Sequence, residues 1–178
     1  MRTTNRALAR QLVAEARHSL EKVYLPRITR CLGMLSDEDI WWRPHPTSNS
    51  AGNMVLHLAG NVRQWIVSGL GGALDVRQRD EEFAETGPLP RRALAARLRA
   101  AVKEAGRVLA RLDASELARE RMIQGFRVTG CKAVFHVTEH FAYHTGQIIF
   151  VTKLKRGEDL KFTRLPGDKR KSARLPAV

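Results

Sequence analysis

Three of the six histidines lie four residues apart in the segment HVTEHFAYH, as His136, His140 and His144. Four residues make about one turn of an α-helix, so two imidazoles at this spacing face the same side and can bind one metal ion. At about 100° per residue, His140 and His144 fall on the apolar stripe of the segment and His136 falls on its flank. We therefore predict that His140 and His144 point inward as a pair of metal ligands.

A third candidate ligand, His57, lies on the more polar of two adjoining stripes in the apolar segment GNMVLHLAGNVRQW. Three imidazoles would leave a divalent ion with at least one position for water or substrate, as in catalytic sites. Because neither a thiolate nor a carboxylate cluster accompanies them, the donor set favours zinc, nickel or another borderline transition ion. Alternatively, each ring could hydrogen-bond to a carbonyl or hydroxyl across the fold, since buried polar groups need partners.

Two known metal motifs are excluded by spacing. A zincin requires a glutamate directly after the first histidine of its HExxH pair, and Phe141 follows His140 here. A ferritin-like di-iron bundle requires Glu-x-x-His pairs, and Ala142 lies three residues after Glu139.

Several neighbours of the three histidines could support the site. Asn61 and Gln147 lie about one turn from His57 and His144, where they could hydrogen-bond to the ligands from outside. Tyr143 and Arg63 are candidate catalytic residues, although a tyrosine here could equally serve packing.

Candidate substrate-binding residues are Arg77, Arg79 and Trp65. An arginine fork could hold an anionic thiol or a carboxylate, and the tryptophan could line a pocket or belong to the core. The arginines also lie beside three acids with which they could pair on a solvated surface: Asp80, Glu81 and Glu82.

Every strongly periodic segment has the helical period, which predicts an all-α fold, an up-down four-helix bundle. The first helix begins near Thr3 or Thr4, carries a stripe that includes Leu8 and Leu12, and is kinked at Pro26. The other helices are expected at about 52–69, 90–112 and 129–156, and residues 113–128 fit an extended excursion. We predict one metal-binding domain over 1–156 and a basic, loosely ordered tail over 157–178.

The formal charge of +13 is concentrated in two segments. Residues 91–111 contain seven Lys or Arg against one acid, and residues 153–178 contain nine against three. Because no known nucleic-acid recognition motif accompanies these charges, specific nucleic-acid binding is not favoured. A chain of 178 residues with no long apolar run and no apolar N-terminal segment indicates no membrane association and a cytoplasmic protein.

The blocks NSAGNMVLHLAGNVRQW, RQRDEEF and HVTEHFAYHTGQI together resemble the DinB/YfiT-like superfamily of metalloenzymes, and in particular one bacterial branch of it. The resemblance covers roughly residues 36–156 and implies a four-helix bundle in which His57, His140 and His144 bind nickel or zinc. It also implies a homodimer. Characterised relatives are S-transferases and isomerases that use low-molecular-weight thiols such as bacillithiol or mycothiol. His136 matches no ligand of the family.

Two functions follow as hypotheses. The first is a metal-dependent enzyme, a thiol-dependent S-transferase or a hydrolase, that acts on a small electrophile as its small-molecule substrate. The second is a non-catalytic metal-binding or stress-response protein whose basic helix and tail contact an acidic partner or nucleic acid.

Overall fold

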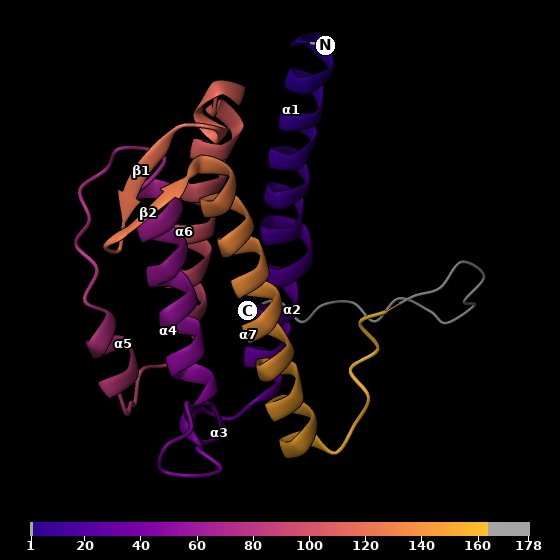
Figure 1. Cartoon of the computed structure of the whole chain (residues 1–178). Helices are drawn as coiled ribbons and strands as arrows, with labels where there is room; N and C mark the ends of the chain where they lie inside the picture. The colour runs from indigo at the N-terminus through magenta and orange to yellow at the C-terminus, as the bar shows by residue number, and fades with distance from the viewer. Residues whose placement is uncertain (1, 164–178) are drawn as a thin grey trace.

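The computed structural model describes residues 2–163, in which four long helical rods pack around one apolar core (Figure 1). The first rod is formed by α1 (Arg2–His18), the π-helical turn η1 (Ser19–Tyr24) and α2 (Leu25–Met34). The second rod is α4 (Ala51–Val62) continued by a second π-helical turn, η2 (Arg63–Ser68). The third is α6 (Arg91–Arg111) and the fourth is α7 (Gly130–Arg156). The expected all-α four-helix bundle is confirmed.

Short elements connect the rods: α3 (Asp37–Trp41), α5 (Arg79–Ala84), η3 (Ala114–Leu117), β1 (Glu120–Ile123) and β2 (Phe126–Thr129). The strands form an antiparallel hairpin in which Ile123 pairs with Phe126. Its two-residue turn has φ of 52° at Gln124 and 79° at Gly125, and such left-handed turns match the twist of a hairpin. The extended excursion expected between residues 113 and 128 is therefore this hairpin.

The second and third rods run in the same direction, so the helices do not alternate strictly. At one end, the Trp41 indole N–H donates to the Leu89 carbonyl at 3.3 Å, and the same indole lies against Gly52. At the other end, Gly71 lies against Val108. Residues 69–90 therefore return along the outside of α4 and carry α5 with them (Figure 1). This return brings α5 beside the middle of α4.

The first rod differs from its sequence-based prediction in two ways. The π-helical turn ends directly before Pro26, with the Leu25 N–H bonded to the Leu20 carbonyl five residues earlier. Because proline has no N–H and crowds the preceding turn, this widened turn accommodates Pro26 where a kink is predicted. The expected apolar stripe is also shifted, since Leu8 and Leu12 are exposed and Val13 is buried.

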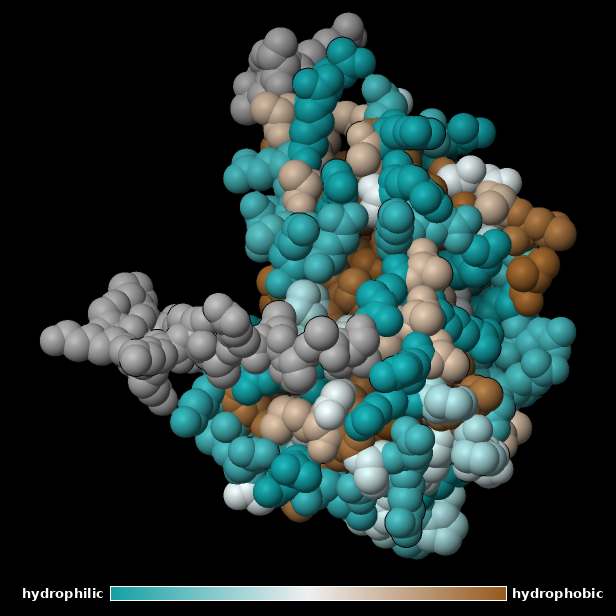
Figure 2. Space-filling view, turned by 180° about the vertical axis from the view of Figure 1, so that it is seen from behind, coloured by the Kyte–Doolittle hydropathy of each residue, from teal (hydrophilic) through white to brown (hydrophobic). Residues whose placement is uncertain are grey.

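The third rod confirms the predicted amphipathic helix. Its inward residues are all buried: Leu94, Leu98, Val102, Ala105 and Leu109. Its arginines are mostly exposed, and α6 lies on the side of the molecule seen from behind, where hydrophilic side chains predominate (Figure 2).

The fourth rod, α7, begins at the N-cap Thr129, whose hydroxyl accepts from the Lys132 N–H at 3.2 Å. It ends at Gly157, whose φ of 65° is the left-handed conformation typical of helix C-caps. Phe141 and His144 are buried on its inner side. Its phase is thus the one predicted from the histidine spacing.

After α7 the chain stays in contact with the bundle up to the last described residues. Leu160 is fully buried, and the Phe162 ring lies beneath the guanidinium groups of Arg27 and Arg30. This part of the predicted tail is therefore packed. Residues 164–178 lie outside the described residues, and the domain division at residue 156 stays a prediction.

Within residues 2–163, no helix combines the length and apolar composition that crossing a bilayer requires.

Asn53 fastens the returning segment to α4. Its side-chain oxygen accepts from the Ser50 N–H at 3.1 Å, which completes a capping box, and from Arg43 at 3.0 Å. Its amide nitrogen donates to the carbonyls of Glu82 at 3.0 Å and Glu85 at 2.7 Å. One buried side chain therefore both begins α4 and sets the position of α5.

We predict that Asn53→Ala lowers the free energy of unfolding by about 2–4 kcal/mol, because it removes a cap and leaves the buried Glu82 carbonyl without its side-chain donor. Urea unfolding measures the change. The same substitution at exposed Asn49 is the control, with an expected loss below about 0.5 kcal/mol. Equal losses in the two variants would contradict the fastening role.

Candidate metal centre

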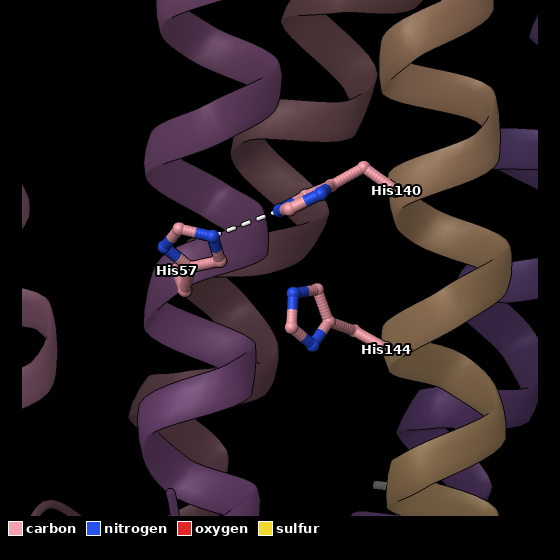
Figure 3. A group of neighbouring side chains, drawn as sticks. All are labelled: His57, His140 and His144. Atoms are coloured by element: carbon pink, nitrogen blue, oxygen red, sulfur yellow. Dashed lines mark hydrogen bonds between the residues drawn. The ribbon is translucent and has the colours of Figure 1, made fainter.

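Three imidazoles from two helices meet between α4 and α7 (Figure 3). His57 comes from α4, and His140 and His144 come from successive turns of α7. One nitrogen of each ring lies within 4.8 Å of the others, and the Nε2 atoms of His57 and His140 are 2.8 Å apart. The two segments that the sequence singled out are thus brought together at one point.

The spacing of these nitrogens suits one metal ion. A tetrahedral ion bound at about 2.0–2.1 Å places its ligand nitrogens about 3.4 Å apart. The observed distances, from 2.8 Å to at most 4.8 Å, lie on both sides of that value. Small rotations of the rings would therefore suffice to bind the ion. Within residues 2–163, His57, His140 and His144 form a group that can hold a metal ion.

Behind His57, its Nδ1 atom lies 2.9 Å from the carboxylate of Glu82. The Arg77 guanidinium donates to both oxygens of the same carboxylate at 2.8 Å. Arg77 also approaches the His57 Nδ1, at 3.1 Å, but an ionised carboxylate can only accept, so the Nδ1 atom beside Glu82 must carry a proton. The His57 Nδ1–H therefore donates to Glu82, which leaves the Nε2 lone pair facing the other two rings.

The Glu82 carboxylate stays ionised although it is buried. Burial alone would raise the pKa of Glu82, but hydrogen bonds from Arg77 and His57 outweigh burial and hold the pKa below its ordinary value. Arg77 is also bound to the Gln64 side-chain oxygen at 2.8 Å. The carboxylate behind His57 thus has a fixed charge and a fixed position.

Glu82 is the functional residue that the sequence did not single out. It is one of three successive acids, of which Asp80 and Glu81 are exposed. Only the neighbouring Phe83 signals an inward side of this short helix, and its ring centroid lies 4.6 Å from that of His57. Which of the three acids is buried depends on the path of residues 69–90 along α4. Local sequence does not determine that path.

Gln147 has the position expected for a supporting residue. Its side-chain oxygen lies 2.7 Å from the His144 Nδ1, so that nitrogen donates and Nε2 is free to bind a metal. Burial lowers the pKa of His144 to about 4, although the Gln147 hydrogen bond raises it. Burial, together with the neighbouring rings, lowers the pKa of His140 to about 3. Both rings are neutral at pH 7, as metal binding requires.

Asn61 supports His136 instead of a ring of the cluster. Its amide nitrogen lies 3.2 Å from the His136 Nε2, and its buried side-chain oxygen has no partner among the described residues. The His136 ring packs at a tilt against Trp65, with centroids 4.0 Å apart, and is stacked with the His140 ring at 5.2 Å. His136 and Trp65 therefore flank the cluster on the hairpin side.

The other candidate residues lie farther from the three nitrogens. Arg63 is paired with Glu104 of α6, and Arg79 is exposed above the Phe83 ring. Tyr143 is largely exposed, with its ring centroid 5.0 Å from that of His144. Since Arg77 is engaged by Glu82, none of these arginines presents a free fork to the cluster. Their roles in catalysis and substrate binding stay predictions.

The fold is that of DinB-like proteins. A solved DinB-like protein from Bacillus subtilis, YjoA, matches 88% of this chain and 95% of its own with a TM-score of 0.58 and 22% identity. A conserved protein from Enterococcus faecalis matches 85% of this chain and 97% of its own with a TM-score of 0.62 and 16% identity. At these identities the likeness concerns the fold.

The chain belongs to the family described as "Protein of unknown function (DUF1572)", whose model matches residues 6–169. With the two structural neighbours, this match confirms the resemblance to the DinB/YfiT-like superfamily. No curated protein matches the sequence significantly.

The lowered pKa values predict that the metal-free protein loses stability between pH 7 and pH 5. An unfolded histidine takes up a proton near its ordinary 6.5, whereas folded His140 does so only at about 3. Acidification therefore favours the unfolded state throughout this range. Between pH 7 and pH 5, we expect the free energy of unfolding of the wild type to fall by about 1–2 kcal/mol more than that of His140→Gln. Urea unfolding at the two pH values measures both changes. Equal losses would contradict the prediction.

We predict that Glu82→Gln weakens binding of Ni²⁺ or Zn²⁺ by about 10–100-fold, because the ring of His57 loses its charged partner. Competition with a chelator measures the affinity. Glu81→Gln, which makes the same change at the exposed neighbouring acid, is the control and should bind as wild type does. Wild-type affinity in Glu82→Gln would show that the carboxylate does not support the site.

Proposed function

We propose that this protein is a metal-dependent enzyme in which His57, His140 and His144 bind one divalent ion, nickel or zinc. The ion would activate a thiol or a water molecule for transfer to a small electrophile, which makes the protein a thiol-dependent S-transferase or a hydrolase. The observation that carries the proposal is the convergence of three imidazoles, two of which are oriented from outside by Glu82 and Gln147.

When bound, such an ion acts as a Lewis acid and lowers the pKa of a coordinated thiol or water. The chain's own residues prepare the site for it. Glu82 and Gln147 hold the Nδ1 protons of His57 and His144 and so direct both Nε2 atoms inward. The Phe83 ring packs against His57, and the Trp65 ring packs against His136 beside the cluster.

Three protein ligands favour catalysis over a purely structural metal site. Structural zinc sites are usually closed by four protein ligands, whereas catalytic sites keep a position for water or substrate. Within the described residues, the cluster comprises three ligands and no fourth. The second hypothesis, a metal-binding protein that contacts an acidic partner or nucleic acid, is supported by the exposed arginines of α6.

We predict that protein purified without an affinity tag contains about one nickel or zinc ion per chain, and that His144→Ala loses it. The variant should also lose the metal-dependent consumption of thiol with a panel of electrophiles, since no third imidazole completes the site. Elemental analysis and a thiol assay provide the two measurements. His45→Ala, at an exposed histidine outside the cluster, is the control.

The outcome separates the hypotheses. Loss of both metal and turnover in His144→Ala supports an enzyme. Metal binding without turnover, combined with steeply salt-dependent retention on nucleic acid, would favour the second hypothesis. Wild-type metal content in His144→Ala would contradict both.

A further inference from the structure

A cavity of about 610 Å³ adjoins the metal centre between α4 and α7. Its wall is formed by the loop at residues 44–49, by Met54 of α4 and by residues 143–151 of α7, including His144. This volume lies within the range of pockets that bind small molecules. Since a proposed metal ligand belongs to the wall, a molecule in the cavity is placed next to the site.

The wall of this cavity is uncharged. Met54, Tyr143 and Phe150 give it an apolar part, and Gln147 is among its neutral polar groups. No lysine, arginine, aspartate or glutamate belongs to the wall as described. The cavity is open to solvent at Tyr143 and Phe150, and its floor is formed by buried Met54 and His144. A carboxylate or an ammonium group that reached this floor would lose hydration without gaining an ion pair, which is costly.

Charged side chains gather instead around a second cavity, of about 450 Å³, behind His57. Arg63, Arg77 and Glu82 line it, and none of the three clustered histidines does. The Arg77 and Glu82 side chains bind each other there and separate this cavity from the ring of His57. An anion held by these arginines would therefore be kept away from the metal centre.

Gln147 connects the uncharged cavity to the metal centre. Its carboxamide oxygen accepts from the His144 Nδ1. Its NH₂ group donates no hydrogen bond within residues 2–163 and belongs to a side chain of the cavity wall. This donor is therefore available to a carbonyl oxygen of a bound molecule.

We propose that the substrate of the metal centre is an uncharged, partly apolar small molecule with a carbonyl or similar acceptor. Its acceptor is held by the Gln147 amide, and its apolar part lies against Met54, Tyr143 and Phe150. The role as substrate rests on the function proposed above, whereas binding in the cavity does not.

Three probes of the same shape test the charge preference: benzamide, benzoate and benzamidine, which are neutral, anionic and cationic. Binding to the metal-free protein, followed by NMR chemical shifts, avoids direct coordination of benzoate to an ion. We expect benzamide to bind at least about tenfold more tightly than either charged probe, because only benzoate and benzamidine carry a charge whose hydration is lost on binding. Equal or tighter binding of a charged probe, or no binding of benzamide, overturns the proposal.

Two matched variants locate the binding site. A Cβ at Gly146 would meet no atom within 4 Å, so Gly146→Leu adds bulk to the cavity wall without a clash. Ala142→Leu introduces the same side chain one turn earlier on the exposed side, outside the wall. We expect Gly146→Leu to weaken benzamide binding at least about tenfold and Ala142→Leu to leave it unchanged. Unchanged binding in Gly146→Leu overturns the proposal.

Phe150→Ala gives a second measurement should Gly146→Leu fail to fold. Phe150 is 63% exposed, so its truncation costs little stability, yet it removes part of the apolar wall. Benzamide binding should weaken in this variant as well. Wild-type binding would count against the cavity.

A final experiment uses the protein loaded with Ni²⁺, whose unpaired electrons increase the relaxation rate of nearby protons. Benzamide protons should relax faster in the loaded wild type than in the metal-free protein. If benzamide binds to protein that holds Ni²⁺ but its protons relax no faster than with the metal-free protein, the proposed location is overturned. Failure of the protein to bind Ni²⁺ overturns the metal-dependent function itself, and the two failures are thus distinguished.

Discussion

The buried carboxylate of Glu82 is the interaction on which the site depends. A carboxylate at this depth is stable only because Arg77 donates to both of its oxygens and His57 donates a third hydrogen bond. The same contacts fix which nitrogen of His57 carries the proton. Without them, His57 could turn or change tautomer, and the three imidazoles would no longer face one another as metal ligands.

The connection between α4 and α6 is what places Glu82 behind His57. Because residues 69–90 return along α4, an acid twenty-five residues after His57 lies behind its ring. Asn53 holds the returning segment through the carbonyls of Glu82 and Glu85. Fold and site are therefore linked by hydrogen bonds from the Asn53 side chain to the backbone of the returning segment. The charged Glu82 carboxylate lies behind His57, whereas the uncharged cavity lies beside His144.

The arrangement of the site residues along α7 could be predicted from sequence, because it follows from the helical period. The phase of α7 identifies His140 and His144 as neighbours on its inner side, and Gln147 is close to His144 by helical geometry alone. The phase of the first rod could not be predicted in the same way. Leu8 and Leu12 are exposed whereas Val13 is buried, because a stripe followed in steps of four residues drifts by about 40° per step around the helix.

Non-local features were beyond the reach of the sequence. Arg77 and Glu82 are only five residues apart, but their burial depends on a crossover that no short motif specifies. Asn61 lies one turn from His57, and yet it contacts His136 of α7, since its direction on α4 is set by packing between the helices. Helical spacing, together with the polar stripe on α4, was enough to predict that His57, His140 and His144 meet. It could not place the returning segment that carries Arg77 and Glu82, nor the contact between Asn61 and His136.

X-ray absorption of the protein loaded with one equivalent of zinc tests the central claim most directly. We expect three imidazole nitrogens at about 2.0–2.1 Å from the metal and one further light ligand from solvent. Loss of one imidazole from this shell in a variant of His57 would complete the assignment. A spectrum without imidazole scattering, or one unchanged by that substitution, would contradict it.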